Sequence, residues 1–162
     1  FESEEGVGST FWIELPLVTN DEVIIWSDTL RVGVDAIDKD HQMIISLVNR
    51  ITHRSVDDVE LDTIVNDMID YTRYHFRREE AIMQVCGYPD LEVHRQLHHK
   101  LVAETIELAD AWRKDRNLMT LKNLRKFLRD WWMGHISNVD TVIAKYTKGK
   151  ELIIRNHLER LG

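Results

Sequence analysis

Four long stretches of the chain place apolar residues at spacings of three and four, which is the pattern of helices that bury one face. The scarcity of Gly and Pro favours long helices over many short strands. The four predicted helices cover about residues 38–53, 57–85, 91–113 and 120–146. A further amphipathic piece, residues 150–161, is expected to pack on something, because a dozen isolated helical residues are only marginally stable.

Polar residues and glycine mark the predicted helix ends. Asp38 and Asp90 are candidate N-caps, and the second helix is expected to stop near Gly87. Because the connections are short, neighbouring helices should be antiparallel, and the expected fold is all-α, an up-down-up-down antiparallel four-helix bundle. Its predicted parts are a linker and N-terminal arm (20–37), the bundle (38–148) and a C-terminal helical extension (149–162).

Residues 1–19 differ from the rest of the chain. Residues 10–18 are dense in β-branched and aromatic side chains and predict a strand. A lone strand has no partner in a helical bundle, so this piece is expected to belong to a sheet elsewhere. Since the chain starts with Phe1 instead of Met, we expect it to be a fragment of a longer protein.

The words Gly-Val-Gly-Ser-Thr-Phe-Trp-Ile-Glu-Leu-Pro-Leu, residues 6–17, resemble the C-terminal end of the ATP-binding domain of sensor histidine kinases. In that family a Gly-x-Gly-Ser-Thr-Phe turn precedes the last strand. The resemblance implies a parent kinase, with a response regulator as partner and a homodimer formed through the kinase. The alternative is a strand that matches by chance. The present chain by itself is not expected to be an enzyme.

Charge and composition narrow the partners. The net charge of -7 argues against nucleic acid or an anionic membrane surface. No segment approaches the roughly 20 apolar residues that a membrane span needs, so direct membrane insertion is not expected. A single cysteine, Cys86, rules out an internal disulfide and fits a cytoplasmic protein. A packed thiol is the favoured role for Cys86, and a redox or ligand role is the alternative.

Histidines and carboxylates occupy apolar stripes from which amphipathic helices normally exclude them. A buried carboxylate or charged imidazole is costly unless it is paired or bound to a metal, so several in one core indicate a metal site. The residues of this set are His41, His75, Glu79, His94, His98, His135 and Asp140. Any one of these histidines alone would more simply be a hydrogen-bonded core residue.

Helical spacing agrees with a shared site. His75 and Glu79 are four residues apart and lie only about 40° apart around a helix, and the two histidines of the third stretch are spaced in the same way. His135 and Asp140 are five residues apart, about 140° on an ideal helix. Asp140 is therefore expected to reach sideways toward the site.

The donor set predicts the kind of metal. Five imidazoles and two carboxylates exceed what one tetrahedral zinc uses. They suit two ions that lean toward octahedral geometry and share carboxylates, and iron is the natural candidate. The set is richer in histidine and poorer in carboxylate than the usual di-iron pattern of helical bundles. Its lower negative charge favours reversible ligand binding over oxygen cleavage.

The order of these residues resembles the hemerythrin family. The pattern is His41, His75-x-x-x-Glu79, His94-x-x-x-His98 and His135-x-x-x-x-Asp140. Neighbouring words of bacterial hemerythrins are also present: Trp26, Val32-Gly33-Val34, Ile37-Asp38-x-x-His41, Glu79-Glu80-x-x-Met83, Tyr88-Pro89 and Trp132-x-x-His135. The resemblance spans about residues 24–146, and all seven ligand positions of the family are filled.

The resemblance implies roles for these residues. One iron would take His94, His98 and His135, and the other would take His41 and His75 and keep an open position for dioxygen. Glu79 and Asp140 would bridge the two irons, together with an oxo or hydroxo group. Ile44, Leu97, Leu101 and Trp132 would form the apolar wall around the oxygen. Plain core packing explains these four equally well.

Residues outside the pattern are expected at the surface. His53, His99 and His157 should be exposed, and the Arg77-Arg78 pair should be solvated. Glu80 is expected to face solvent or the surroundings of the ligands rather than the metals.

Three functions follow from the sequence. The kinase-like words favour an oxygen- or redox-sensing module of a histidine kinase. The alternative is a stand-alone oxygen carrier or store, which would need neither a kinase remnant nor an extra C-terminal helix. A di-iron nitric oxide reductase or oxidase ranks last, because no additional acid, base or electron relay is evident in the sequence.

Overall fold

The computed structural model describes the backbone of residues 3–4, 8–9, 23–52 and 57–161. The strand predicted at residues 10–18 lies outside the described residues. Ahead of it, β1 (Ser3–Glu4) pairs antiparallel with β2 (Gly8–Ser9). From residue 23 onward the described chain is helical or irregular.

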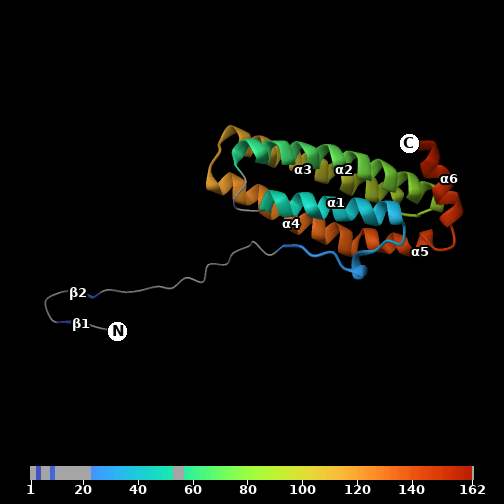
Figure 1. Ribbon diagram of the computed structural model, residues 1–162, viewed down its shortest axis with the longest axis horizontal. Helices are drawn as coiled ribbons and strands as arrows, with labels where there is room; N and C mark the ends of the chain where they lie inside the picture. The colour runs from blue at the N-terminus through green and yellow to red at the C-terminus, as the bar shows by residue number, and fades with distance from the viewer. Residues whose placement is uncertain (1–2, 5–7, 10–22, 53–56, 162) are drawn as a thin grey trace.

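Four long helices run side by side along the longest axis of the molecule (Figure 1). α1 packs against α2 and α4, and α3 packs against the same two helices, so the four close into a ring. This arrangement confirms the predicted all-α bundle, whose short connections make sequence neighbours antiparallel. The helices are α1 (Asp35–Thr52), α2 (Asp58–Cys86), α3 (Leu91–Lys114) and α4 (Leu118–Asn138).

The two ends of α2 are set by local capping residues that can be recognised in the sequence. Asp57 is the N-cap, and its carboxylate accepts from the backbone N–H groups of Val59 at 3.0 Å and Glu60 at 2.8 Å. Gly87 ends the helix in the left-handed conformation with φ of 67°, which glycine adopts without strain. The predicted stop near Gly87 is therefore confirmed. Asp90 precedes α3 as predicted, but its side chain caps no backbone N–H.

The predicted start of α1 was wrong by three residues. The helix begins at Asp35, after Gly33 reverses the chain with φ of 77°, and the N–H of Asp38 already bonds to the carbonyl of Val34 at 2.9 Å. Asp38 is therefore inside the first turn and not the N-cap. Its carboxylate instead accepts the N–H of Val32 at 2.8 Å, which holds the arm against the helix.

The predicted continuation of the fourth helix to residue 146 was also wrong. α4 ends at Asn138, and the 3-10 turn η2 (Asp140–Ile143) and the short α5 (Ala144–Thr147) follow. Side chains compete here with the regular backbone ladder: Asn138 Nδ2 donates to the carbonyl of Gly134 at 3.0 Å, and Thr141 Oγ1 donates to that of Ser137 at 2.8 Å. This change of helical winding sets the direction of Asp140.

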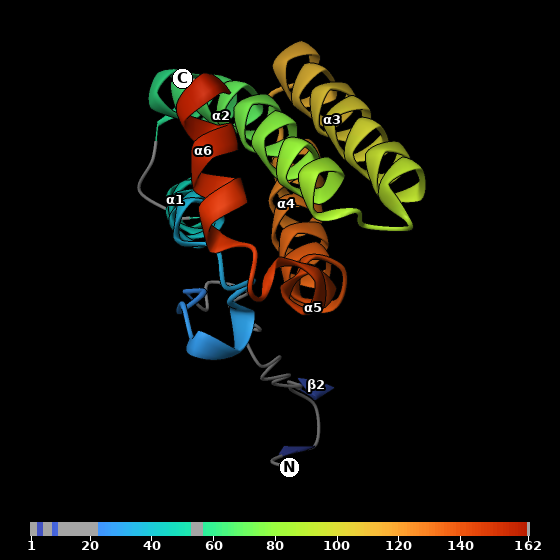
Figure 2. The same cartoon turned by 90° about the vertical axis from the view of Figure 1, so that its right-hand side faces the viewer.

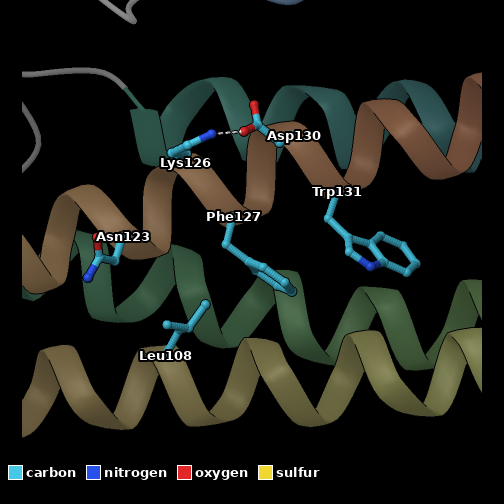
Figure 3. A pocket seen from close by; sticks show the side chains of 6 residues that line it. All are labelled: Leu108, Asn123, Lys126, Phe127, Asp130 and Trp131. Carbon is cyan, nitrogen blue, oxygen red and sulfur yellow. Dashed lines mark hydrogen bonds and ion pairs between the residues drawn. The ribbon is translucent and has the colours of Figure 1, made fainter.

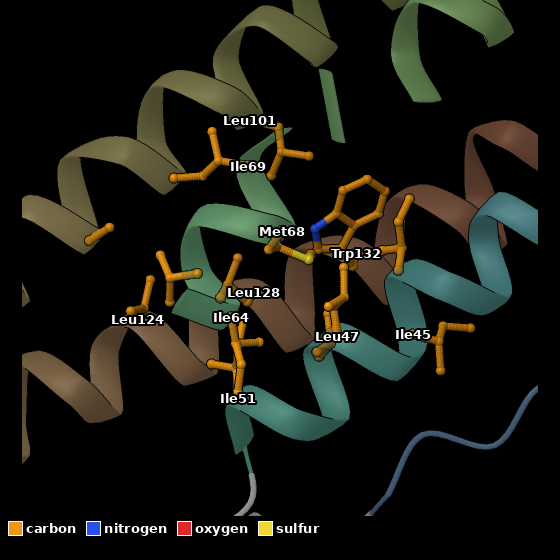
Figure 4. Close-up of a cluster of buried hydrophobic side chains, with 14 of the residues drawn as sticks. Ile45, Leu47, Ile51, Ile64, Met68, Ile69, Leu101, Leu124, Leu128 and Trp132 are labelled. Carbon is orange, nitrogen blue, oxygen red and sulfur yellow. The ribbon is translucent and has the colours of Figure 1, made fainter. Parts of the chain in front are cut away.

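The main core fills the bundle with side chains from all four helices (Figure 4). Ile51, Met68, Leu101, Leu128 and Trp132 are each no more than 1% exposed. Burial of one such side chain contributes about 1.5–3 kcal/mol, so this cluster supplies most of the driving force for helix packing.

A second apolar cluster closes the end of the bundle where α1 begins and α2 ends. The C-terminal helix α6 (Glu151–Leu161) packs there on α2 (Figure 2). Its Ile154, which is 4% exposed, belongs to this cluster. Cys86 lies in this cluster as a free, buried thiol, which confirms the packed role predicted for it. The cluster consists of Val32, Val34, Ile37, Ile82, Cys86 and Ile154.

The arm before α1 is held along the bundle. The backbone N–H and carbonyl of Ile24 pair with the side-chain amide of Asn49 at 2.8 and 2.9 Å. A short 3-10 turn, η1 (Asp28–Leu30), follows, and Leu30 joins the main core. None of the helices within the described residues is long and apolar enough to cross a membrane.

Candidate metal centre

The bundle topology brings the seven predicted ligand residues to one level of the core. His41 lies near the start of α1 and His94 at the start of α3, whereas Glu79 lies toward the end of α2 and His135 near the end of α4. In an antiparallel ring these four helix ends meet at the same end of the bundle. The level lies between the main core and the cluster that α6 covers.

Glu79 lies between histidines of different helices. Its side chain is 1% exposed. Glu79 Oε2 is 3.4 Å from His94 Nε2 and 3.3 Å from His98 Nε2, and it is 3.9 Å from His75 Nε2. The other oxygen, Oε1, is 3.9 Å from His41 Nε2. The carboxylate thus presents one oxygen to α3 and the other to α1.

Asp140 has the same relation to its neighbours. Its Oδ1 is 3.1 Å from His135 Nε2 and 3.4 Å from His94 Nε2, and its Oδ2 is 3.4 Å from His41 Nε2. The sideways reach expected from an ideal helix was wrong, because α4 ends before this residue. Asp140 instead opens η2, and the tighter turn directs its fully buried carboxylate into the core.

The seven side chains form two groups that share Glu79. One ligand atom from each member can be chosen so that all atoms of a group lie within 4.8 Å of one another. Ligand atoms about 2.1 Å from one octahedral ion are about 3.0 Å apart. The distances of 3.1–3.4 Å above are close to that spacing, and the two of 3.9 Å are wider. The groups are His41, His75 and Glu79, and Glu79, His94, His98, His135 and Asp140.

Unsatisfied polar atoms support a metal in this position. Within the described residues, the buried side-chain nitrogen and oxygen atoms that lack a hydrogen-bond partner all belong to these seven residues, apart from one oxygen each on Asp38 and Asp40. Such atoms are expensive to bury, and their concentration at one point is explained if they bind cations. The donors are imidazole nitrogens and carboxylate oxygens without thiolate, a set that suits iron and other first-row metals.

The two carboxylates are held in the charged form. Burial alone would raise the pKa of Glu79, but the neighbouring imidazoles of His94 and His98 outweigh burial and hold that pKa well below its ordinary value. Burial and the neighbouring charge of Glu79 likewise oppose ionisation of Asp140, but His135 and His41 outweigh both and lower its pKa to about 2. The site therefore keeps two anions in an apolar core, and cations are their natural counter-charge.

Outer carboxylates contact the far nitrogens of two ligands. Glu80 Oε1 lies 2.8 Å from His98 Nδ1, and its other oxygen, Oε2, accepts from Arg95 Nε at 3.4 Å. Of the two placements expected for Glu80, the structure has the one beside the ligands. Asp40 was not singled out from the sequence, yet its Oδ2 lies 3.6 Å from His75 Nδ1. In the sequence, the only indication of a role for Asp40 was its position next to His41 in a charged segment.

Arg78 also departs from expectation. It was predicted to be solvated, but its guanidinium donates to Asp40 Oδ1 at 3.1 Å, and its side chain is 20% exposed. Arg77, by contrast, is exposed as predicted. Of the histidines outside the pattern, His99 is exposed, His157 is half-buried, and His53 lies outside the described residues.

Aromatic rings surround the three-histidine side. Phe76 stacks on His98 with ring centres 3.5 Å apart, and Trp131 stacks on His135 at 4.4 Å. Trp131 is half-buried and also lines a surface groove between α3 and α4, across from Leu108 (Figure 3). The half-buried Trp131 ring thus contacts both His135 and this groove.

The residues proposed for an oxygen pocket are not equivalent. Ile44, Leu101 and Trp132 are no more than 1% exposed and belong to the main core, and the Trp132 ring lies 6.2 Å from that of His75. Leu97 is half-buried and is not part of that core. Three of the four wall residues therefore remain candidates, and Leu97 fits the role least.

Known proteins match this architecture. A family model described as the hemerythrin HHE cation-binding domain matches residues 32–146. A bacteriohemerythrin of Stenotrophomonas maltophilia is 27% identical over 128 residues, which cover 78% of this chain and 82% of that protein. One of Methylococcus capsulatus is 31% identical over 105 residues, which cover 64% and 79%. The crystal structure of a wild-type hemerythrin has a TM-score of 0.67 and 28% identity, covering 76% of this chain and 97% of that one.

Two neighbouring histidines of α3 provide a matched test of the site. We predict that His98→Ala lowers the metal content of the purified protein, because it removes an imidazole whose Nε2 points at Glu79. His99→Ala should leave the metal content unchanged, since His99 is exposed. Metal content is measured by mass spectrometry and helix content by circular dichroism. Equal metal content in both variants would contradict the assignment of His98.

Proposed function

Because the chain belongs to the hemerythrin family of HHE cation-binding domains, we propose that it holds two iron ions and binds dioxygen reversibly. The observation that carries the proposal is the position of the two carboxylates. Each presents one oxygen to His41 and the other to the histidines of α3 or α4. Carboxylates in this position can bridge two ions. A single ion would not need two carboxylates that each face histidines on both sides.

The proposed ligands divide as the two groups of the structure suggest. His94, His98 and His135 would hold one iron, and His41 and His75 would hold the other with a position open to dioxygen. Glu79 and Asp140 would bridge the pair, together with an oxo or hydroxo group. The iron pair supplies the electrons that reversible oxygen binding needs, since each ion can alternate between ferrous and ferric forms.

The protein's part is to keep the site dry. Ile44 follows His41 by one turn of α1, Leu101 follows His98 by one turn of α3, and Trp132 precedes His135 by one turn of α4. All three are buried in the main core, which therefore borders the ligands with apolar surface. Exclusion of water and anions protects a reduced iron site from irreversible oxidation.

Oxygen binding can be observed directly. We predict that the iron-loaded, reduced protein takes up one dioxygen per pair of irons and develops a visible absorption band that disappears when oxygen is removed. The absorption spectrum and an oxygen electrode record the two events. Stoichiometric oxygen consumption without recovery of the starting spectrum would instead support an oxidase and overturn the proposal of reversible binding.

We also propose that oxygen binding is read by a histidine kinase to which this domain is joined. The kinase-like words at residues 6–17 support this role. So does the way in which the arm is held: Val32 donates its N–H to Asp38 at 2.8 Å and accepts from Thr147 Oγ1 at 3.3 Å. Asp38 lies one turn before His41, and Thr147 follows the segment that Asp140 begins.

These contacts offer a route from the site to the N-terminal side of the domain. A shift of His41 or Asp140 on ligand binding would displace the partners on either side of Val32. Further upstream, the arm is also hydrogen-bonded to α1 through Asn49. A displacement at Val32 would therefore be transmitted along the arm.

In a parent kinase, we predict that the autophosphorylation rate differs between the reduced, oxygenated and oxidised states. Thr147→Val should shrink that difference at unchanged iron content, because it removes the hydroxyl that contacts Val32. Thr63→Val is the control, since within the described part of the chain the Thr63 hydroxyl bonds to the carbonyl of Val59 at 3.1 Å, inside α2. Equal rates in all three states would exclude the sensor role and leave an oxygen carrier or store.

A further inference from the structure

Asp40 is a buried carboxylate that belongs to neither ligand group. It precedes His41 on α1, is 3% exposed, and faces α2. Three side chains of α2 surround it: Tyr71, His75 and Arg78. A charged group in this setting requires partners, and its contacts indicate what it does.

One oxygen of Asp40 is firmly held. Oδ1 accepts from the phenol of Tyr71 at 2.8 Å and from Arg78 Nη1 at 3.1 Å. Arg78 is in turn positioned by Tyr74, whose hydroxyl lies 2.9 Å from the same nitrogen and whose ring lies 5.0 Å below the guanidinium. These contacts fix the carboxylate in place.

The other oxygen has no hydrogen bond and faces an equally unpartnered nitrogen. Oδ2 of Asp40 and Nδ1 of His75 are both buried without a hydrogen-bond partner among the described residues, and they lie 3.6 Å apart. That separation exceeds an ordinary hydrogen bond by about 0.7 Å. A small shift of the His75 ring would satisfy both atoms at once.

We propose that Asp40 is a positioning residue for His75: its Oδ2 accepts the Nδ1–H and so leaves the Nε2 lone pair, on the Glu79 side of the ring, free to bind the metal. The proposal rests on the metal role of His75 stated above. Imidazole ligands of metals usually donate their second N–H to a carboxylate or carbonyl, which selects the tautomer and makes the ring a better donor. His75 has such an acceptor in Asp40.

The opposite half of the site offers an internal comparison. His98 already has its carboxylate, since Glu80 lies 2.8 Å from Nδ1. The Glu80 side chain is 18% exposed, whereas that of Asp40 is 4% exposed. Each half therefore has one outer carboxylate held by an arginine, and the one beside His75 is the better shielded from water.

The first test uses the metal-free protein. Nitrogen-15 NMR of the His75 ring reports which nitrogen carries the proton. We expect the Nδ1–H form in the natural protein and a loss of that preference in Asp40→Asn. Tyr71→Phe, which removes one contact to the carboxylate, should have a smaller effect. Glu80→Gln should change the His98 signals and leave those of His75 unaltered.

The second test uses the iron-loaded protein. Asp40→Asn should weaken iron binding about 10- to 100-fold. It should also raise the reduction potential, because a less basic His75 stabilises ferric iron less well. Glu80→Gln should perturb the three-histidine half instead. Mössbauer spectroscopy separates the two irons and shows which one each variant changes.

The outcomes distinguish this inference from the proposed function. Asp40→Asn with an unchanged His75 tautomer would overturn the positioning role, even if iron and oxygen still bind. The predicted tautomer change in a protein that binds no iron would leave the positioning role standing and refute the proposed function. Loss of helix content in Asp40→Asn shifts the test to the natural metal-free protein, in which the Nε2–H form of His75 would contradict the proposal.

Discussion

The burial of two carboxylates among five imidazoles is the interaction on which the rest of this structure depends. Glu79 and Asp140 are almost completely buried, and the neighbouring imidazoles hold the pKa of each carboxyl group below its ordinary value. Charged carboxylates in an apolar core require nearby positive charge. The chain meets that requirement by placing ligands at the starts of α1 and α3 and the ends of α2 and α4. Only an antiparallel ring brings those four ends together, so topology and site chemistry constrain one another.

The irregular parts of the fold also help to bury the two carboxylates among the imidazoles. A regular continuation of α4 would turn Asp140 away from His135, and the change to a 3-10 turn after Asn138 avoids this. The apolar clusters on either side of the ligands keep the level dry, and the arm and α6 complete the cluster at the open end of the bundle. The arm therefore belongs structurally to the site, although it contributes no ligand within the described residues.

The sequence was sufficient for whatever is encoded in local periodicity. The apolar stripes predicted the four helices, Asp57 and Gly87 mark the ends of α2, and the candidate ligands could be named because polar groups interrupted the stripes. Features that depend on tertiary contacts were not predictable. The start of α1 depends on the turn at Gly33, and the role of Asp40 exists only because α2 brings Tyr71 and Arg78 beside it. A charged segment of one helix does not show which side chains of the neighbouring helix will contact it.

The central claim is that two iron ions share Glu79 and Asp140, and anomalous diffraction at the iron absorption edge tests it most directly. Crystals of the iron-loaded protein should show two anomalous peaks inside the bundle, one beside His41 and His75 and the other beside the three remaining histidines, with both carboxylates in contact with both peaks. A single peak, or two peaks that share neither carboxylate, would contradict the account.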